Sequence, residues 1–225
     1  MQKIGVIARY LGFLLNFAMM LELTAAEIEE TKGLLATFES LHTTSTSLFD
    51  PLFEAGEVVV FPKNHVIMEP GAQLRDIYII VDGLVGATYI SENKIVMDGL
   101  AVPGTVLLHG GSFFRKSPSF MQWEALVQTK AIRIPDSAIR DYLHSNHEFA
   151  IWMYGLAENQ NLYNDEKKFI LSDSAEQRYL KLFNNLPRKI FRQLSSRVVA
   201  RYLRITEQSL SRIKRKLIEE GKTDL

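Results

Sequence analysis

Apolar residues in the first 135 positions fall mostly into short runs of the kind that form β-strands. Helical spacing covers 26–42 and a short stretch at 48–53, and then the period changes. Seven β-branched and aromatic runs follow, bounded by Pro and Gly turns: 58–61, 65–68, 77–81, 84–90, 94–100, 121–127 and 131–134. Short strands at this spacing predict an antiparallel barrel or double-sheet roll. Asp82-Gly83, between two of these runs, is the strongest hairpin signal.

Helical spacing returns after Pro135 and predicts one long helix over 136–172. Its apolar positions form a single sparse seam: Ile139, Leu143, Phe149, Trp152 or Met153, Leu156, Tyr163 and Ile170. Because such a seam is hard to bury within a small domain, we expect it to pair with the same helix of a second copy. Packing on the chain's own roll is the alternative for part of the length. A further helix starts at Asp173-Ser174 and ends before Pro187.

The segment 195–217 predicts two short helices joined by a tight turn. Small Ala200 lies in the first, where two crossing helices need to approach closely, and Thr206 is a natural N-cap for the second. In the second helix, residues three and four apart form a buried face: Leu210, Ile213 and Leu217. The opposite face carries donor-rich side chains: Gln208, Ser211, Arg212 and Arg215. These features predict a helix-turn-helix, whose second helix reads DNA.

The charge distribution supports this interpretation. Residues 178–225 hold 13 Lys and Arg against 4 Asp and Glu, whereas residues 1–177 hold 13 against 22. The net charge of zero is therefore the sum of an acidic N-terminal part and a basic C-terminal part. A basic C-terminal module attracts the phosphate backbone, and its binding weakens as salt rises. The alternative for this module is an amphipathic helical hairpin with a solvated basic face.

Composition narrows the chemistry. With 47% apolar residues the chain can bury a core, and the absence of cysteine excludes disulfides, thiolate metal sites and thiol nucleophiles. The sequence contains no His-x-His pair, nucleophile elbow, P-loop or His-Glu-x-x-His motif. We therefore expect no catalytic residue, no cofactor and no metal, so the chain is not an enzyme.

The first 26 residues stand apart. Their apolar run at 10–21 is shorter than the roughly 20 residues of a spanning helix. A positive start and Thr24-Ala25-Ala26 imitate a signal peptide. Three interpretations are open: an upstream extension, a helix packed on the protein or its dimer mate, and an export or anchor signal. Because a secreted DNA-binding protein makes little physical sense, we expect a cytoplasmic protein without stable membrane association.

Roll, long helix and helix-turn-helix follow one another in an order that resembles the Crp/Fnr family of bacterial one-component transcription regulators, over roughly 28–217. The resembling stretches are 67–71 with 78–84, then 174–180, and most specifically 199–217. The resemblance implies an α+β fold. This fold begins with an N-terminal antiparallel β-roll of the double-stranded β-helix or jelly-roll type, with flanking helices. A long dimerisation helix and a C-terminal helix-turn-helix domain follow the roll.

The resemblance also implies roles for the second helix, which begins near Thr206. Base-contacting positions fall on Glu207, Gln208 and Arg212, and Ser209, Ser211 and Arg215 lie beside them towards the backbone. Four further basic residues either contact phosphates or are simply solvated: Arg197, Arg201, Lys214 and Lys216. The chain departs from the family pattern at Arg204, where glycine is usual and a positive φ would strain any other residue. It also ends eight residues past Leu217, without room for the usual β-wing.

The segment 106–125, where the resemblance places an effector site, departs further from the family. Members that bind cyclic AMP carry a Gly-Glu pair for the ribose and an arginine for the phosphate; here no Gly-Glu pair is present, and Gln122 or Trp123 stands at the arginine position. We therefore expect no ordinary cyclic AMP binding. Side chains that could still face another ligand are His109, Ser112, Arg115, Gln122 and Trp123. Alternatively, these are core, capping or solvated loop residues.

The predicted organisation has four parts: an extension at 1–26, a sensor roll at 27–135, a dimerisation helix at 136–172 and a helix-turn-helix domain at 173–225. The predicted protein is a homodimeric regulator that binds a near-palindromic site on double-stranded DNA. RNA polymerase and an unidentified small molecule are its further candidate partners. The alternative function is a regulatory module that acts through protein contacts without binding DNA.

Overall fold

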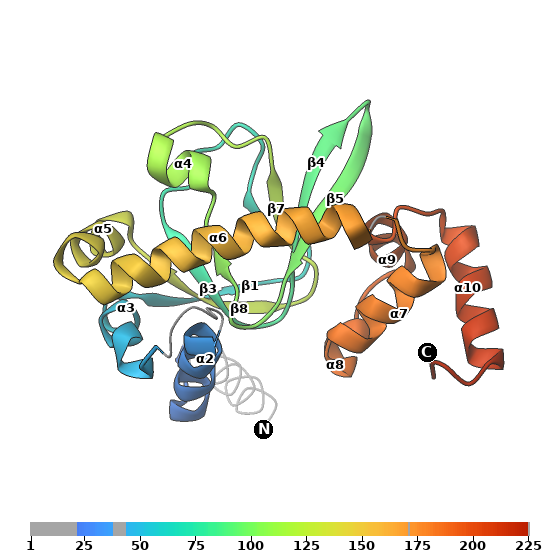
Figure 1. Cartoon of the computed structure of the whole chain (residues 1–225), viewed down its shortest axis with the longest axis horizontal. Helices are drawn as coiled ribbons and strands as arrows, with labels where there is room; N and C mark the ends of the chain where they lie inside the picture. Colours follow the sequence, from blue (N-terminus) through green and yellow to red (C-terminus); the bar gives the residue numbers. More distant parts are fainter. Residues whose placement is uncertain (1–21, 38–43, 171, 225) are drawn as a thin grey trace, which may run out of the picture.

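The computed structural model describes residues 22–37, 44–170 and 172–224, with the backbone alone over 164–170. The predicted apolar run at 10–21 and the end of the predicted helix over 26–42 lie outside the described residues. In Figure 1 a β-roll and its flanking helices occupy one end, α6 runs lengthwise across the molecule, and the C-terminal helices form the other end.

The β-roll consists of two antiparallel sheets. The first has the strand order β1-β8-β3-β6 and the second β2-β7-β4-β5. The strand bounds are β1 Glu57–Phe61, β2 Val66–Met68, β3 Ile77–Asp82, β4 Val85–Ser91, β5 Lys94–Ala101, β6 Val106–Leu107, β7 Gln122–Ala125 and β8 Thr129–Ile134. The seven predicted strands are therefore confirmed, and β6 is an addition. Side chains facing between the sheets alternate along the strands, which gives each sheet one buried face.

The predicted hairpin at Asp82-Gly83 is wrong. The two flanking strands, β3 and β4, lie in different sheets, so this turn carries the chain from one sheet to the other. Gly83 has a φ of +104°, and a Cβ there would lie 2.6 Å from the carbonyl oxygen of Gln128. The tight hairpin joins β4 to β5 instead. Its two-residue loop, Glu92-Asn93, has positive φ at both positions, as a type I′ turn requires.

Helices surround the roll and continue beyond it. Those before or within the roll are α2 Ala25–Thr37, the 3₁₀ turn η1 Thr46–Phe49, α3 Asp50–Ala55 and α4 Gly110–Arg115. Those after it are α5 Asp136–Ser145, α6 His147–Ile170, α7 Ala175–Asn185, α8 Arg188–Phe191, α9 Ser196–Tyr202 and α10 Glu207–Glu219. Ser174 caps α7 in a reciprocal capping box with Gln177, which confirms the predicted start of that helix.

The predicted continuous helix over 136–172 is two helices. Asn146 leaves the helical conformation, with φ −128° and ψ 110°, and so ends α5. Its side-chain Oδ1 then accepts from the amide of Phe149, 2.9 Å away, which begins α6. The spacing of apolar residues continues through Asn146, so the sequence pattern gave no sign that the helix ends there.

From Ile139 to Leu156 the predicted seam faces the chain's own roll, whereas the side chain of Ile170 lies outside the described residues. Ile139, Phe149, Trp152 and Met153 are buried in one cluster with roll residues, and the indole of Trp152 donates to the carbonyl of Leu35 over 3.1 Å. Pairing of these residues with a second copy is therefore a wrong expectation, because their surface is already covered. The exposed apolar side chains of α6 are different ones, Tyr154 and Leu162.

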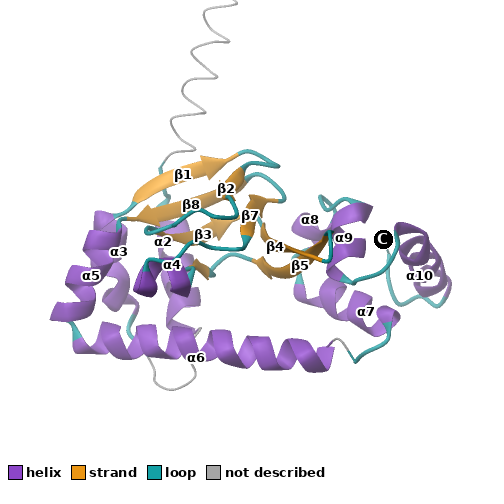
Figure 2. Ribbon diagram, turned by 90° about the horizontal axis from the view of Figure 1, so that it is seen from above, coloured by secondary structure: helices purple, strands orange, loops and turns teal. Residues whose placement is uncertain are grey.

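The C-terminal helices share a core with the roll. One buried cluster contains Leu84 and Met97 of the roll together with Tyr179, Phe183 and Val199 of the helices. In Figure 2, α9 lies next to the β4–β5 hairpin, and α10 lies at the far end of the molecule. The roll thus supports α9 while leaving the outer side of α10 open.

Candidate nucleic-acid interface

Helices α9 and α10 form the predicted helix-turn-helix. The Thr206 hydroxyl accepts from the amide of Ser209 over 3.1 Å, which confirms its role as the N-cap of α10. Ala200 is buried between the two helices, and Leu210 and Leu217 are buried on the inner side of α10. A small residue at the crossing and leucines one or two turns apart fix the angle between the helices.

The turn between the helices has the geometry that favours glycine. Arg204 has a φ of +54°. Its amide donates to the carbonyl of Arg201 over 3.1 Å, and the amide of Ile205 donates to that of Ala200 over 3.0 Å. These two bonds form a Schellman motif with Arg204 at its left-handed position. The positive φ expected from the family resemblance is therefore present, and an arginine occupies it.

The outer face of α10, defined as Gln208, Ser211, Arg212 and Arg215, is exposed. Within the described residues, none of these four side chains makes a hydrogen bond or ion pair with the rest of the chain. Glu207 is also exposed, in the first turn of the helix. This face therefore presents amide, hydroxyl and guanidinium donors that are free to contact a partner.

The remaining predicted contacts fall into different surroundings. Ser209 is partly buried, and its hydroxyl lies 2.9 Å from that of Thr206 within the cap. Arg197 is exposed on α9. Lys216 binds Glu176 of α7, with 2.8 Å between Nζ and Oε1. Arg201 lines a small cleft between α9 and the β4–β5 hairpin, on the side of the module that faces the roll.

In the 106–125 segment, His109 and Ser112 bond to their own chain. Nδ1 of His109 caps α4 by accepting from the amide of Ser112 over 3.0 Å. The buried Ser112 hydroxyl donates to the carbonyl of Ser117 over 2.9 Å. Burial lowers the pKa of His109, which keeps the imidazole neutral and able to accept. Both residues thus act as structural caps here.

The other three candidates in this segment are dispersed. Trp123 is buried in the core of the roll. Gln122 lies in β7, with its amide nitrogen 3.4 Å from Oε2 of Glu124. Arg115 is exposed at the end of α4 and lines a cavity. The structure therefore does not bring the five candidate residues together around one ligand position.

That cavity, of about 790 Å³, lies between the roll and α6. The roll and α4 contribute a mainly apolar wall that includes Leu100, Val106 and Phe114. The α6 wall carries polar side chains that are not among the predicted effector residues: Asn159, Gln160, Asn161 and Tyr163. The available signal was the run of three side-chain amides that follows the buried apolar turns of α6.

The sequence matches no protein-family model and no curated protein. The structure, by contrast, is similar to solved structures. FixK2 from Bradyrhizobium japonicum is 18% identical, with a TM-score of 0.64 over 74% of this chain and 86% of that chain. The c-di-GMP responsive global regulator CLP from Xanthomonas campestris is 11% identical, with a TM-score of 0.61 over 79% and 93%. A cyclic nucleotide-binding domain from Methylobacillus flagellatus is 14% identical, with a TM-score of 0.55 over 62% and 79%.

The chain has the fold of Crp/Fnr regulators. The predicted α+β class, with an antiparallel β-roll and flanking helices, is thereby confirmed. At these identities the similarity concerns the Crp/Fnr fold, and the roles of individual residues rest on their own geometry.

Two further observations concern metal and membrane. Among the described residues, no group of three or more His, Asp or Glu side chains is placed to hold a metal ion. None of the helices in the described ranges is long and apolar enough to cross a membrane.

Proposed function

We propose that this chain is a DNA-binding transcription regulator of the Crp/Fnr type. The outer face of α10 carries the proposal: four exposed, donor-bearing side chains on one side of an N-capped helix. A helix of this kind fits the major groove, where base edges present acceptors. Because α10 lies at the end of the molecule away from the roll, a duplex can approach it (Figure 2).

The side chains suggest a division of labour on the duplex. The Arg212 guanidinium can donate to both major-groove acceptors of guanine, and the Gln208 amide can pair with adenine. Each such pair discriminates against a wrong base by about 1–3 kcal/mol. Thr206 and Ser209, whose hydroxyls serve the cap, lie where the free amides of the helix N-terminus can meet a phosphate. Ser211 and Arg215 extend the surface along the groove.

Phosphate contacts complete the interface. Arg197 and Arg215 are exposed cations on the two helices, and the module as a whole carries 13 basic against 4 acidic residues. Lys216 would have to leave Glu176 before it could reach a phosphate. Contacts of this kind make the observed affinity fall as salt rises, because each one releases condensed counterions.

The functional unit of the proposal is a two-fold dimer on a near-palindromic site. Tyr154 and Leu162 on the outer side of α6 supply apolar surface for a second copy, in place of the buried seam. The dimer would set its two recognition helices in successive major grooves, about 34–36 Å apart. Such a regulator acts through RNA polymerase. The chain would meet DNA and RNA polymerase in the cytoplasm.

We further propose that a small molecule other than cyclic AMP occupies the cavity between the roll and α6. A cyclic phosphate needs a paired cation in a semi-buried site. No Gly-Glu pair occurs in 106–125, and Gln122 or Trp123 stands at the family's arginine position. Arg115, which lines the cavity, is exposed at the end of α4 instead. Isothermal titration of the full chain with cyclic AMP should give no binding in the micromolar range. A micromolar affinity would contradict this part of the proposal.

The central test is a single substitution on the outer face of α10. Bound fragments selected from the source genome define the operator, and fluorescence anisotropy then compares operator with random duplex. Arg212→Ala should remove most of the preference for operator, which corresponds to a loss of about 1–3 kcal/mol of discrimination per half-site. Sedimentation equilibrium should show the same oligomeric state as the parent chain.

Arg192→Ala is the matched control, because Arg192 is also exposed in the basic module but lies outside the outer face of α10, 3.7 Å from Asp224. It should keep the preference for operator. Equal discrimination by Arg212→Ala and the parent chain would reject the assignment of α10. If the parent chain bound no duplex at low salt, the alternative function, a module that acts through protein contacts, would replace the regulator.

A further inference from the structure

Tyr163 of α6 rests on a glycine of the roll. A Cβ added to Gly99 of β5 would lie 3.2 Å from the phenolic oxygen of Tyr163, and 3.7 and 3.8 Å from its Cε1 and Cζ ring carbons. Glycine inside a strand weakens it and often marks a close approach of another group. Here the missing side chain makes room for the end of the phenol.

The same tyrosine belongs to the wall of the cavity between the roll and α6. Leu100, the residue after Gly99 in β5, lines this cavity as well. Burial raises the pKa of the Tyr163 hydroxyl, and the nearby Tyr202 and Asp98 raise it further, so the phenol stays neutral. Its ring therefore has the cavity on one side and β5 on another, with Tyr202 of α9 close by.

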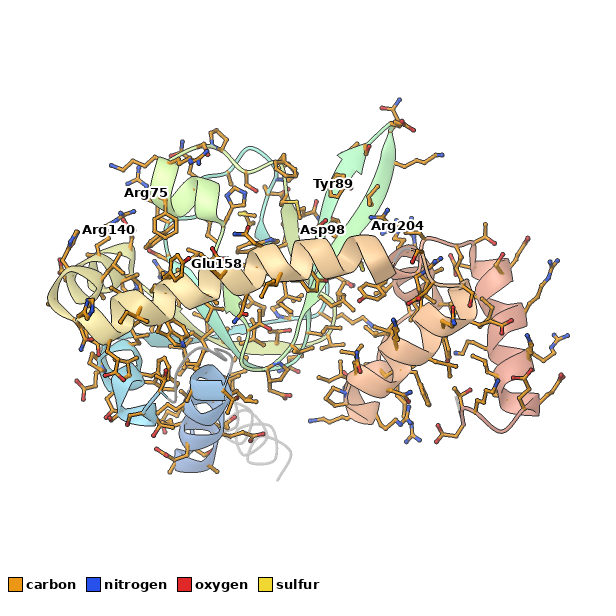
Figure 3. The ribbon with its side chains drawn as sticks, in the orientation of Figure 1. Arg75, Tyr89, Asp98, Arg140, Glu158 and Arg204 are labelled. Atoms are coloured by element: carbon orange, nitrogen blue, oxygen red, sulfur yellow. The ribbon has the colours of Figure 1, made fainter. Side chains whose placement is uncertain are left out.

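Strand β5 is also the surface on which α9 packs. Met97 of β5 is buried in the cluster that contains Val199 of α9, and Leu100 and Tyr202 pack against that cluster. Beside it, the ammonium of Lys63 donates to the carbonyl of Gln193 over 3.3 Å. Figure 3 shows Asp98 of β5 and Arg204, which follows α9, at this junction of roll and helix-turn-helix.

We propose that Tyr163 is a positioning residue that couples occupancy of the cavity to the packing of α9 on β5. The inference rests on the proposed function insofar as it takes the cavity for the effector site. Close-packed interiors transmit small displacements instead of absorbing them, so a ligand that presses on the Tyr163 ring also displaces β5. Because α9 and α10 form one packed unit, the position of the recognition helix changes with it.

The arrangement can be tested without knowing the ligand. In Gly99→Ala the new methyl group meets the phenolic oxygen at 3.2 Å, which is too close, so the ring must shift by a few tenths of an ångström. In the double variant with Tyr163→Phe this oxygen is absent, and the nearest ring contact, 3.7 Å, is an ordinary one. The two substitutions thus form a double-mutant cycle in which the second relieves the first.

Hydrogen exchange of the α9 amides in the full chain is the first readout. Gly99→Ala should speed their exchange by about threefold or more, and the double variant should return to within about twofold of the parent, since residues in contact show coupling of this size. Gly33→Ala is the matched control, because a Cβ there meets no atom within 4 Å. It should leave exchange in α9 unchanged.

Affinity for DNA is the second readout, measured by anisotropy on the parent chain, the two single variants Gly99→Ala and Tyr163→Phe, the double variant and the Gly33→Ala control. It should change in Gly99→Ala and recover in the double variant. Equal α9 exchange in all variants, or a Gly99→Ala effect that Tyr163→Phe does not relieve, would overturn the role of Tyr163. Coupled exchange with unchanged DNA affinity would overturn its link to regulation. A parent chain that binds no DNA would defeat the proposed function, and exchange alone would then decide whether the contact of Tyr163 with β5 is coupled to α9.

Discussion

The outer face of α10 and the 106–125 segment both carry polar side chains, but these differ in whether they are bonded within the chain. In the 106–125 segment His109 and Ser112 satisfy each other and the backbone of α4. On α10, Gln208, Ser211 and Arg212 extend into solvent. Polar groups inside a fold have to find partners within it, whereas exposed donors remain available for another molecule. Sequence motifs alone do not separate these two cases.

The largest expected effect comes from removing the support behind the outer face of α10. Leu210→Ala, at a position only 1% exposed, should lower the free energy of unfolding by about 2–5 kcal/mol, because it leaves a cavity beneath the recognition helix. Urea denaturation followed by circular dichroism measures the change. Ser211→Ala, next to it on the exposed side, should stay within about 0.5 kcal/mol of the parent. Equal effects at both positions would contradict the two-faced description of α10.

A smaller effect should follow in the 106–125 segment. Ser112→Ala removes the hydroxyl that donates to the carbonyl of Ser117, at a position that is 1% exposed. An acceptor left unsatisfied inside the fold costs about 1–3 kcal/mol, which the urea midpoint should report. Ser91→Ala, on the exposed end of β4, is the control and should change little. A neutral Ser112→Ala would return Ser112 to the list of residues available to a ligand.

The smallest expected effect concerns the turn of the helix-turn-helix. Arg204→Gly should raise the free energy of unfolding by about 1 kcal/mol, because glycine has no Cβ to strain at a φ of +54°. The same substitution at exposed Arg197, in the first turn of α9, should lower it by up to about 1 kcal/mol. Opposite signs in parallel urea titrations would support the Schellman turn. A destabilising Arg204→Gly would show that the arginine side chain makes a compensating contribution.

Local sequence patterns predicted the positions of strands and helices well, but predicted less well which strands pair and which surfaces the helices pack on. Strand positions and the start of α10 at Thr206 follow from side-chain period and capping chemistry, which act within a few residues. Asp82-Gly83 correctly marks a reversal of the chain, but a turn does not reveal which sheet receives the next strand. The two-residue strand β6 is too short to show any period.

The long helix illustrates a second limit. Apolar spacing continues across Asn146, so the break became visible only in the backbone angles and the Asn146 cap. That spacing also could not tell a seam that faces a second copy from one that faces the chain's own roll, since both need the same apolar residues. The cavity wall on α6 escaped prediction for a related reason, because it depends on which side of the helix meets the roll.

Whether the basic C-terminal module binds the DNA backbone is decided by the salt dependence of duplex binding. Fluorescence anisotropy of the full chain on a labelled genomic fragment, from low salt to physiological salt, measures it in one series. We expect binding at low salt, with a logarithm of affinity that falls linearly with the logarithm of salt concentration at a slope of about −0.9 for each phosphate neutralised. A chain that leaves the duplex unbound at low salt, or whose affinity does not respond to salt, would contradict this expectation.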